Sequence, residues 1–374
     1  MPRHRSLEFV RMERLLHARR VGLAGSAVMC SAALIYLATA TAGSAVDAAV
    51  IRIPRANGAE AGLPGTGSHP VEVVEEGPGY RVIRHAAGTT RVPASPQRVC
   101  ALSAADELLA IGLKPVAHSI NDGNFPDYLA EPLADVPWIP NVYGAHLPNL
   151  EAVVRVRPDL IITRNTSRQT YLQLSQIAPV VVLLDHLVNY RQRLLDVGVV
   201  VGRRRQAEAR LAWYNAKVSA ANAVLHPIVG SRTMAMMAVR PRIYRLFGDQ
   251  NHVSPLLYGD LQMKRPDLVR NRTWSSTISP EQLLRFDADY LLVAVSGNGE
   301  GRRTYDVLRK SFVWSRVPAI RNECTLAVPK WRHWSDSGIL GRARGIDDVL
   351  RLVSAESIAT VNAQADAARN ESLP

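Results

Sequence analysis

Polar and aromatic side chains follow the apolar runs of this sequence, at the points where buried strands would end. Guanidinium groups pair with the oxygens of anions, and indole rings stack on flat rings. Ligands of two-lobed α/β proteins bind in the crevice at the carboxyl ends of the strands, so these side chains predict a site for an anionic, aromatic chelate. The candidates are Ser103, Arg164, Arg240, Arg242, Tyr244, Trp331, Arg332 and Trp334.

Each candidate also has a simpler interpretation. Only five of the 45 basic residues are lysine, so arginine is abundant and any single candidate can be an ordinary surface charge. Each tryptophan can serve packing alone. His333, beside Trp334, is a potential ligand of haem iron or of another metal, although a lone histidine is more often an ordinary polar residue.

Catalytic motifs are absent from the sequence. There is no Gly-x-Ser-x-Gly, no His-Glu-x-x-His and no phosphate-binding glycine loop, and the ten histidines show no ligand spacing. The glycine-rich run 297–301 follows an apolar run without opening a clear helix, which favours a flexible loop. We therefore expect a binding protein rather than an enzyme, with no metal site of its own and no covalently bound cofactor.

Two stretches of the chain repeat each other in register, 149–162 and 279–292. Each begins with a good N-cap residue, Asn149 or Ser279, and places a glutamate, Glu151 or Glu281, in the first turn, where the helix dipole favours a carboxylate. An aspartate follows eight residues after each glutamate, and an apolar run of the kind found in buried parallel strands comes next. The repeat predicts two similar α/β lobes, each presenting one glutamate at a helix start.

A proline-free stretch, Tyr190 to Leu225, separates the two copies and carries apolar residues at helical spacing. Gly198 and Gly202 should split it into a shorter helix and a long one of about twenty residues. The predicted fold is α/β, with two Rossmann-like lobes, each with a mostly parallel sheet, joined by one long rigid α-helix. The predicted parts are a basic cytoplasmic N-region (1–20), a signal peptide or transmembrane anchor (21–42), a flexible linker (43–78), the N-terminal lobe (79–189), the helical backbone (190–226), the C-terminal lobe (227–355) and a tail expected to fray (356–374).

The N-terminal segment predicts export. Residues 21–42 carry no charge and are long enough to span a bilayer, and the arginines before them favour a cytoplasmic N-terminus. Ala38-Thr39-Ala40 fits a signal-peptidase site, so a cleaved signal peptide competes with a retained anchor. Both alternatives place the rest of the chain at the cell surface or in the periplasm, associated with the membrane unless the segment is cleaved. Lipidation of Cys30 is disfavoured by the residues before it.

The net charge of +12 raises nucleic-acid binding as an alternative. The sequence has no zinc-finger spacing, no RNA-binding aromatic motif and no basic run beyond Arg203-Arg204-Arg205. We expect no nucleic-acid partner.

The order of motifs along 80–353 resembles the helical-backbone, or class III, substrate-binding proteins of ABC importers, the branch that serves ferric siderophores, haem and vitamin B12. The chain looks most like the iron-siderophore receptors. Singly the matching segments are weak, but in this order they are specific. They are Gly88–Pro93, Pro96–Val99, Ile111–Val116, Asn149–Glu151 with Arg157–Ile162, Ile177–Pro179, Ile278–Leu283 and Trp331–Asp348.

The resemblance implies a monomeric receptor that captures a ferric siderophore and docks on the transmembrane subunits of an ABC permease. In this family one glutamate from each lobe meets permease arginines, and Glu151 and Glu281 stand at those positions. Two carboxylates on separate rigid lobes would form a two-point electrostatic clamp, whereas the simpler interpretation is that each only stabilises its helix start. A haem or cobalamin carrier of the same fold is the alternative, and a membrane-anchored metal-dependent enzyme or sensor ectodomain is a more distant one.

Overall fold

The computed structural model describes most of the chain from residue 71 to residue 371. The predicted parts 1–20 and 21–42 and most of the linker 43–78 lie outside the described residues. Among the described residues, none of the helices combines the length and the apolar composition that a bilayer span needs. The described ranges are 71–120, 125–142, 147–164, 166–184, 189–248, 251–270, 275–295, 299–328, 331–334 and 338–371.

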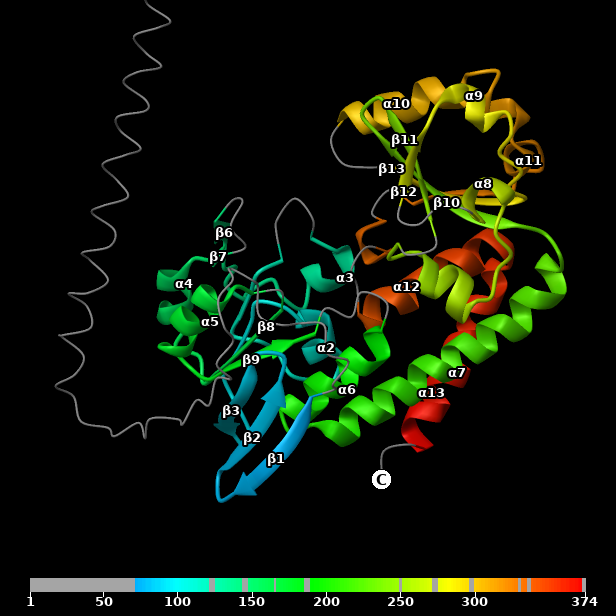
Figure 1. Ribbon diagram of the computed structural model, residues 1–374. Helices are drawn as coiled ribbons and strands as arrows, with labels where there is room; N and C mark the ends of the chain where they lie inside the picture. The colour runs from blue at the N-terminus through cyan, green and yellow to red at the C-terminus, as the bar shows by residue number, and fades with distance from the viewer. Residues whose placement is uncertain are drawn as a thin grey trace, which may run out of the picture. The chain divides into compact units, whose positions relative to one another are not determined.

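The N-terminal lobe is built on a parallel sheet of four strands in the order β5-β4-β8-β9 (Figure 1). All of β9 and all but the last residue of β8 are buried, as expected for strands covered on both faces. The predicted α/β lobe with a parallel sheet is confirmed. The elements are β4 Val99–Ala101, α2 Ala105–Ala110, β5 Ala117–His118, α3 Asp127–Ala130, β6 Asn141–Val142, β7 Leu147–Pro148, α4 Leu150–Arg155, β8 Leu160–Arg164, α5 Arg168–Ser175 and β9 Val180–Leu183.

A separate antiparallel sheet, β1-β2-β3, precedes this lobe. Strands β2 (Tyr80–His85) and β3 (Gly88–Pro93) form a hairpin at the start of the predicted N-terminal lobe, whereas β1 (Glu72–Gly77) lies within the stretch predicted as linker. A two-residue turn of Pro78 and Gly79 joins β1 to β2, and Gly79 has φ 79°, as a type II turn requires. Part of the stretch predicted as linker therefore forms a strand.

Two helices form the strut between the lobes, α6 (Tyr190–Val200) and α7 (Arg204–Val229). The predicted break falls between them at Gly202, whose φ of 73° favours glycine. Gly198 allows the helices to cross closely, because a Cβ there would lie 2.5 Å from the Cβ of Ala207. In Figure 1, α7 extends from the N-terminal lobe to the C-terminal lobe as one continuous helix.

The C-terminal lobe has a five-stranded sheet in the order β12-β11-β10-β13-β14. β10 pairs in parallel with β13, and β13 with β14, but β11 and β12 pair antiparallel, so this sheet is mixed rather than mostly parallel. A tight turn after β10 sends β11 straight back along it. The elements are β10 Met234–Arg240, β11 Ile243–Phe247, the π-helix η2 Pro255–Asp260, α8 Asp267–Arg270, β12 Ser275–Ile278, α9 Pro280–Leu283, β13 Tyr290–Val295, α10 Gly299–Arg309, η3 Trp314–Arg316, α11 Pro318–Arg321, β14 Thr325–Val328, η4 Trp331–Trp334 and α12 Ile339–Val353.

Two helical segments were not expected from the sequence. α10 begins within the glycine-rich run predicted as a flexible loop, and it buries Tyr305 and Leu308. The tail predicted to fray forms a short 3-10 helix, η5 (Ala355–Ser357), and then α13 (Ile358–Glu371), which packs along α7 (Figure 1). Val361 and Ala365 of α13 are fully buried, so this helix gains the apolar contact that stabilises it.

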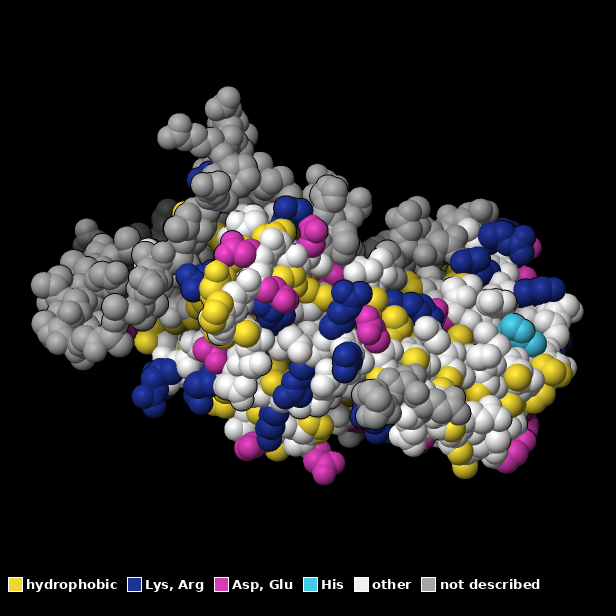
Figure 2. Space-filling model, turned by 90° about the horizontal axis from the view of Figure 1, so that it is seen from below, with side chains coloured by type: hydrophobic (Ala, Val, Ile, Leu, Met, Phe, Trp, Pro, Cys, Tyr) yellow, Lys and Arg dark blue, Asp and Glu magenta, His cyan; other side chains and the backbone are white. Residues whose placement is uncertain are grey.

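Basic side chains on the face shown in Figure 2 are scattered among acidic ones. They do not gather there into one stripe of the kind that tracks a nucleic-acid backbone. Much of the arginine on this face is therefore ordinary surface charge.

Candidate functional site

The two repeated segments form matching capped helices. Asn149 Oδ1 accepts a hydrogen bond from the Ala152 amide at the start of α4, at 2.9 Å. Ser279 and Gln282 form a reciprocal capping box at the start of α9. Both glutamates, Glu151 and Glu281, are exposed, and the hydrogen bond from Ser279 lowers the pKa of Glu281. The predicted presentation of one glutamate at each helix start is thus present in both lobes.

The aspartates that follow each glutamate by eight residues bind the backbone just before a neighbouring strand. Asp159 accepts hydrogen bonds from the Gln97 and Arg98 amides, at 2.7 and 2.9 Å, just before β4. Asp289 accepts from the amide and the hydroxyl of Thr233, at 2.7 and 3.0 Å, just before β10. The repeat therefore sets the position of each glutamate helix relative to the first strand of its own sheet.

Two N-terminal candidates lie at the carboxyl ends of adjacent strands. The Ser103 amide donates to the Ile162 carbonyl at 3.1 Å, which places Ser103 beside the end of β8. Its hydroxyl oxygen is buried and has no hydrogen-bond partner among the described residues. Arg164 is the last residue of β8 and is half-buried. The structure therefore places Ser103 and Arg164 together at the carboxyl ends of the strands, as predicted from their positions after apolar runs.

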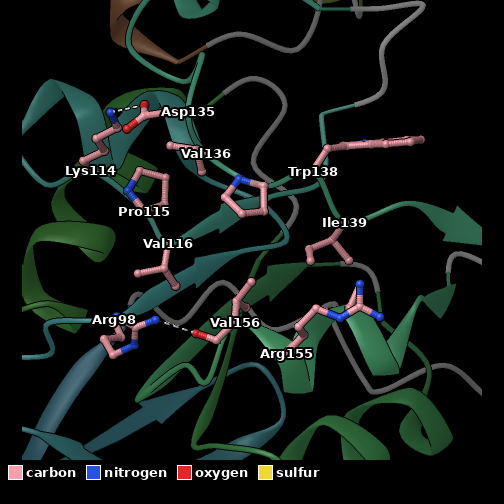
Figure 3. Close-up of a pocket in the computed structure, with 12 residues that line it drawn as sticks. Arg98, Lys114, Pro115, Val116, Asp135, Val136, Trp138, Ile139, Arg155 and Val156 are labelled. Atoms are coloured by element: carbon pink, nitrogen blue, oxygen red, sulfur yellow. Dashed lines mark hydrogen bonds and ion pairs between the residues drawn. The ribbon is translucent and has the colours of Figure 1, made fainter.

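One cavity, of about 640 Å³, lies at the other end of this sheet (Figure 3). Its lining includes Arg98 and Val116, which precede β4 and β5, and Arg155 and Val156, which end α4. These positions are the amino ends of the strands, whereas ligands of such folds bind at the carboxyl ends. We therefore do not assign the cargo site to this cavity, despite its size.

A smaller cavity, of about 360 Å³, is lined by both lobes. Asp127 and Tyr128 of α3 face it from the N-terminal lobe, and Val328 and His333 from the C-terminal lobe. It lies after the end of β14, at the carboxyl end of the second sheet. This is the kind of position at which the fold is expected to hold a ligand.

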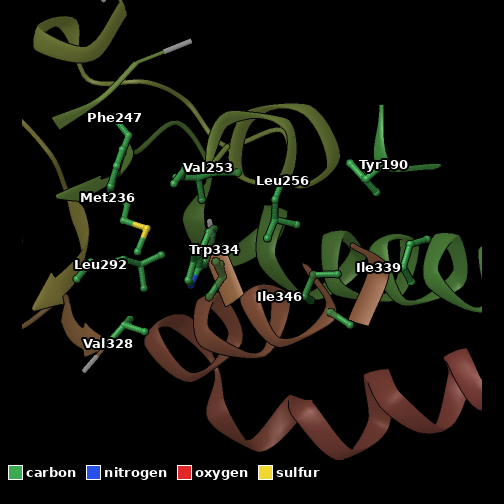
Figure 4. Packing of buried hydrophobic residues seen from close by; sticks show 14 of the residues in the cluster. Tyr190, Met236, Phe247, Val253, Leu256, Leu292, Val328, Trp334, Ile339 and Ile346 are labelled. Carbon is green, nitrogen blue, oxygen red and sulfur yellow. The ribbon is translucent and has the colours of Figure 1, made fainter. Parts of the chain in front are cut away.

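Trp334 and His333 are engaged with the protein itself. The Trp334 ring is 2% exposed and packs between the sheet and α12, with Met236, Phe247 and Leu292 on the sheet side (Figure 4). Asp348 Oδ2 accepts a hydrogen bond from the indole nitrogen of Trp334 at 2.8 Å. The same oxygen lies 2.6 Å from His333 Nε2, with which it forms a second hydrogen bond. Trp334 serves the packing role that its sequence position left open, so we do not retain it as a ligand contact.

Two further candidates, Trp331 and Arg332, belong to η4, but their side chains lie outside the described residues. Within the part of the chain that is described, no group of three or more His, Cys, Asp and Glu side chains is arranged to hold a metal ion.

Arg240 and Arg245 form a pair of like charges at the end of β10. Figure 4 shows Met236 and Phe247 on the face of the sheet that meets Trp334, and because side chains alternate along strands, Arg240 and Arg245 lie on this same face. The Nε atoms of both are buried and lack a hydrogen-bond partner among the described residues. Burial, and then the charge of Arg245, lowers the pKa of Arg240. The pair therefore places two half-buried positive charges near the carboxyl end of β10, where ligands of such folds bind.

The other two candidates of this region lie apart from that pair. Tyr244 pairs with Val239, so alternation places it on the opposite face of the sheet. Arg242 is exposed in the turn with φ 58°, and its amide donates to Thr304 Oγ1 of α10 at 3.2 Å. Arg245 was not predicted from the sequence, although a charged residue within the strand 243–247 indicates a position of this kind.

Several known proteins similar to this chain are named for binding iron complexes or siderophores. The chain is 26% identical over 264 residues to the probable siderophore-binding lipoprotein YfiY of Bacillus subtilis. This alignment covers 65% of this chain and 78% of that protein. It is 31% identical over 215 residues to the Fe(3+) dicitrate-binding periplasmic protein FecB of Escherichia coli, covering 55% and 69%. The crystal structure of Staphylococcus aureus SirA complexed with staphyloferrin B has the same fold, with a TM-score of 0.60, 24% identity and coverage of 72% and 97%.

The two lobes, the helical strut and the repeated capped helices agree with these similarities. The family model described as periplasmic binding protein matches residues 101–329, which is more than half of the chain and includes both repeated segments. The chain belongs to this periplasmic binding protein family.

Proposed function

We propose that the protein is the extracytoplasmic substrate-binding component of an ABC importer and that its cargo is a ferric siderophore held between the two lobes. The names of its relatives support this cargo class. The observation that carries the proposal for this chain is the pair Arg240 and Arg245, with buried, unpartnered Nε groups at the carboxyl end of β10.

The chemistry of the arginine pair suits an anionic chelate. Two half-buried guanidinium groups on the same face of one sheet repel each other, and each carries donors that cost free energy when they are left without acceptors. The catecholate or carboxylate oxygens of a ferric complex would supply both the acceptors and the opposing charge. Ser103 and Arg164, at the carboxyl ends of adjacent strands, place further polar groups in the N-terminal lobe.

Delivery would use the two exposed glutamates. Glu151 and Glu281 stand on separate lobes, each at the first turn of a capped helix. We propose that they meet basic residues on the two transmembrane subunits of the permease, and that the N-terminal segment holds the protein at the membrane. The protein acts as a monomer, performs no chemistry on its cargo and holds no covalent cofactor.

A fluorescence titration tests the cargo assignment. Purified protein is titrated with ferric citrate, ferric catecholate and ferric hydroxamate siderophores, haem and cobalamin while tryptophan emission is followed. We expect quenching by one siderophore class at micromolar concentration or below. Arg240→Gln and Arg245→Gln should each weaken binding by about 10- to 100-fold, since each removes a charged hydrogen bond.

The matched control is Arg205→Gln, because Arg205 is exposed on α7 and lies outside the proposed site. It should leave the affinity unchanged. Quenching by haem or cobalamin alone would contradict the proposed cargo. Equal affinities for all three variants would contradict the proposed site.

A further inference from the structure

The repeat between the lobes extends past the glutamates to a pair of exposed apolar side chains. Val154 and Leu284 occupy equivalent positions, each three residues after its glutamate, and they are 50% and 52% exposed. The residues just before them, Val153 and Leu283, are also equivalent, and both are fully buried in their own lobes. The two lobes thus share one pattern of a buried anchor followed by an exposed apolar residue.

Helical geometry places each glutamate beside its apolar partner. Residues three apart on a helix are neighbours on one face, so Glu151 and Val154 lie together on α4. Leu284 is the C-cap of α9 and keeps helical backbone angles, φ −63° and ψ −22°, so the same holds for Glu281 and Leu284. Each lobe therefore presents a carboxylate and an apolar side chain next to each other.

A single exposed apolar residue is unremarkable in a soluble protein. Two at equivalent positions, with matching exposure and matching charged neighbours on separate lobes, indicate a common use. A partner that fits both must present two like surfaces, each with a cation beside an apolar hollow. The two transmembrane subunits of an ABC permease, the partner proposed above, would be such a pair.

We propose that Val154 and Leu284 are apolar contacts of the permease interface, each seating beside the site that receives its glutamate. This inference rests on the proposed function, from which it takes the partner. The glutamates and the apolar residues would have different effects on binding. Opposite charges raise the rate of encounter and set orientation, whereas buried apolar area slows dissociation.

The experiment uses the permease of the same transport system in lipid nanodiscs and records association and dissociation rates of the full-length protein by biolayer interferometry. Val154→Thr and Leu284→Asn keep side-chain size and add polarity. They should speed dissociation by about fivefold and about tenfold, with little dependence on salt. Glu151→Gln and Glu281→Gln should instead slow association, and this effect should shrink as salt rises.

Matched controls are Val74→Thr on β1 and Ile228→Thr near the end of α7, whose apolar side chains are 38% and 41% exposed. Neither should change either rate. Dissociation of the Val154 and Leu284 variants at the control rate, while the glutamate variants still slow association, would overturn the apolar contacts alone. No binding of the unchanged protein to the permease would overturn both docking roles.

The siderophore titration separates this inference from the cargo assignment. The Val154 and Leu284 variants should bind cargo as the unchanged protein does. If no siderophore binds but the nanodisc results are as expected, the cargo is wrong and the interface stands.

Discussion

A buried carboxylate, Asp106, joins three helices between the lobes. Its two oxygens accept hydrogen bonds from the Leu340 and Gly341 amides, both at 3.1 Å, at the start of α12. Tyr128 of α3 donates a third at 2.5 Å. Gly338 makes room for this arrangement, because a Cβ there would lie 2.3 Å from Asp106 Oδ1. Asp106 therefore ties α2 of the first lobe to α12 of the second.

The charge on Asp106 carries a cost that depends on pH. Burial, and then the neighbouring charge of Glu107, raises the pKa of Asp106 from 3.8 to about 6, although its three donors act in the other direction. Glu107 is itself paired with Arg193 at 2.6 Å. Between the two pKa values the folded protein binds more protons than the unfolded chain, so the free energy of unfolding falls as pH rises. The difference of about two units corresponds to about 3 kcal/mol.

His85 produces a pH dependence of the opposite sign. Its Nδ1 accepts from the Ala87 and Val182 amides, at 3.2 and 3.3 Å, so the folded ring is neutral there. Burial lowers the pKa of His85 from 6.5 to about 4. The unfolded chain therefore gains protons first as pH falls, and the free energy of unfolding rises with pH by about 3 kcal/mol over this window. The two contributions nearly cancel in the unchanged protein.

The substitution Asp106→Asn removes only the Asp106 contribution, the one that makes the free energy of unfolding fall as pH rises. We expect its free energy of unfolding, minus that of the unchanged protein, to increase by about 3 kcal/mol between pH 4 and pH 7. Urea denaturation at one-unit steps of pH, followed by circular dichroism, measures this difference. A difference that stays constant across the range would refute the assignment of this proton to Asp106.

Three further substitutions test the scaffold. His85→Asn keeps an acceptor but cannot titrate, so its free energy of unfolding, minus that of the unchanged protein, should fall by about 3 kcal/mol between pH 4 and pH 6.5 in the same denaturation series. Gly198→Ala should cost about 1–3 kcal/mol because its Cβ meets that of Ala207, and adding Ala207→Gly should restore most of the melting temperature. Lys217→Met leaves Asp347, its partner at 2.7 Å, buried without a counter-charge, so unfolding free energy should fall by about 3–5 kcal/mol; a loss below 1 kcal/mol would contradict that role.

Features set by local sequence were predictable. The side chains of Asn149 and Ser279 bind backbone amides only three residues further on, and Gly202 needs only its own positive φ. The local sequence alone therefore indicated the repeated helices and the break in the strut. Apolar runs such as 160–163 also predict buried strands, because their composition alone favours burial.

Features set by distant contacts were not predictable. Trp334 could point to a ligand or to the core, and only the packing of α12 decides between them. Strand β1 carries two adjacent glutamates and a bulge, so its alternation is broken in the sequence. Helix α13 is polar and alanine-rich, and it forms because α7 offers a surface to it.

The pairing of α13 with α7 turns the strut into a two-helix beam. Trp213 donates to Asp366 at 3.0 Å, and Lys217 reaches Asn362, so bending α7 would have to break these cross-links. We expect the spacing of the two glutamates to be the same in empty and loaded protein. An empty carrier would then occupy the permease as readily as a full one, and uptake would slow whenever carriers outnumber their cargo.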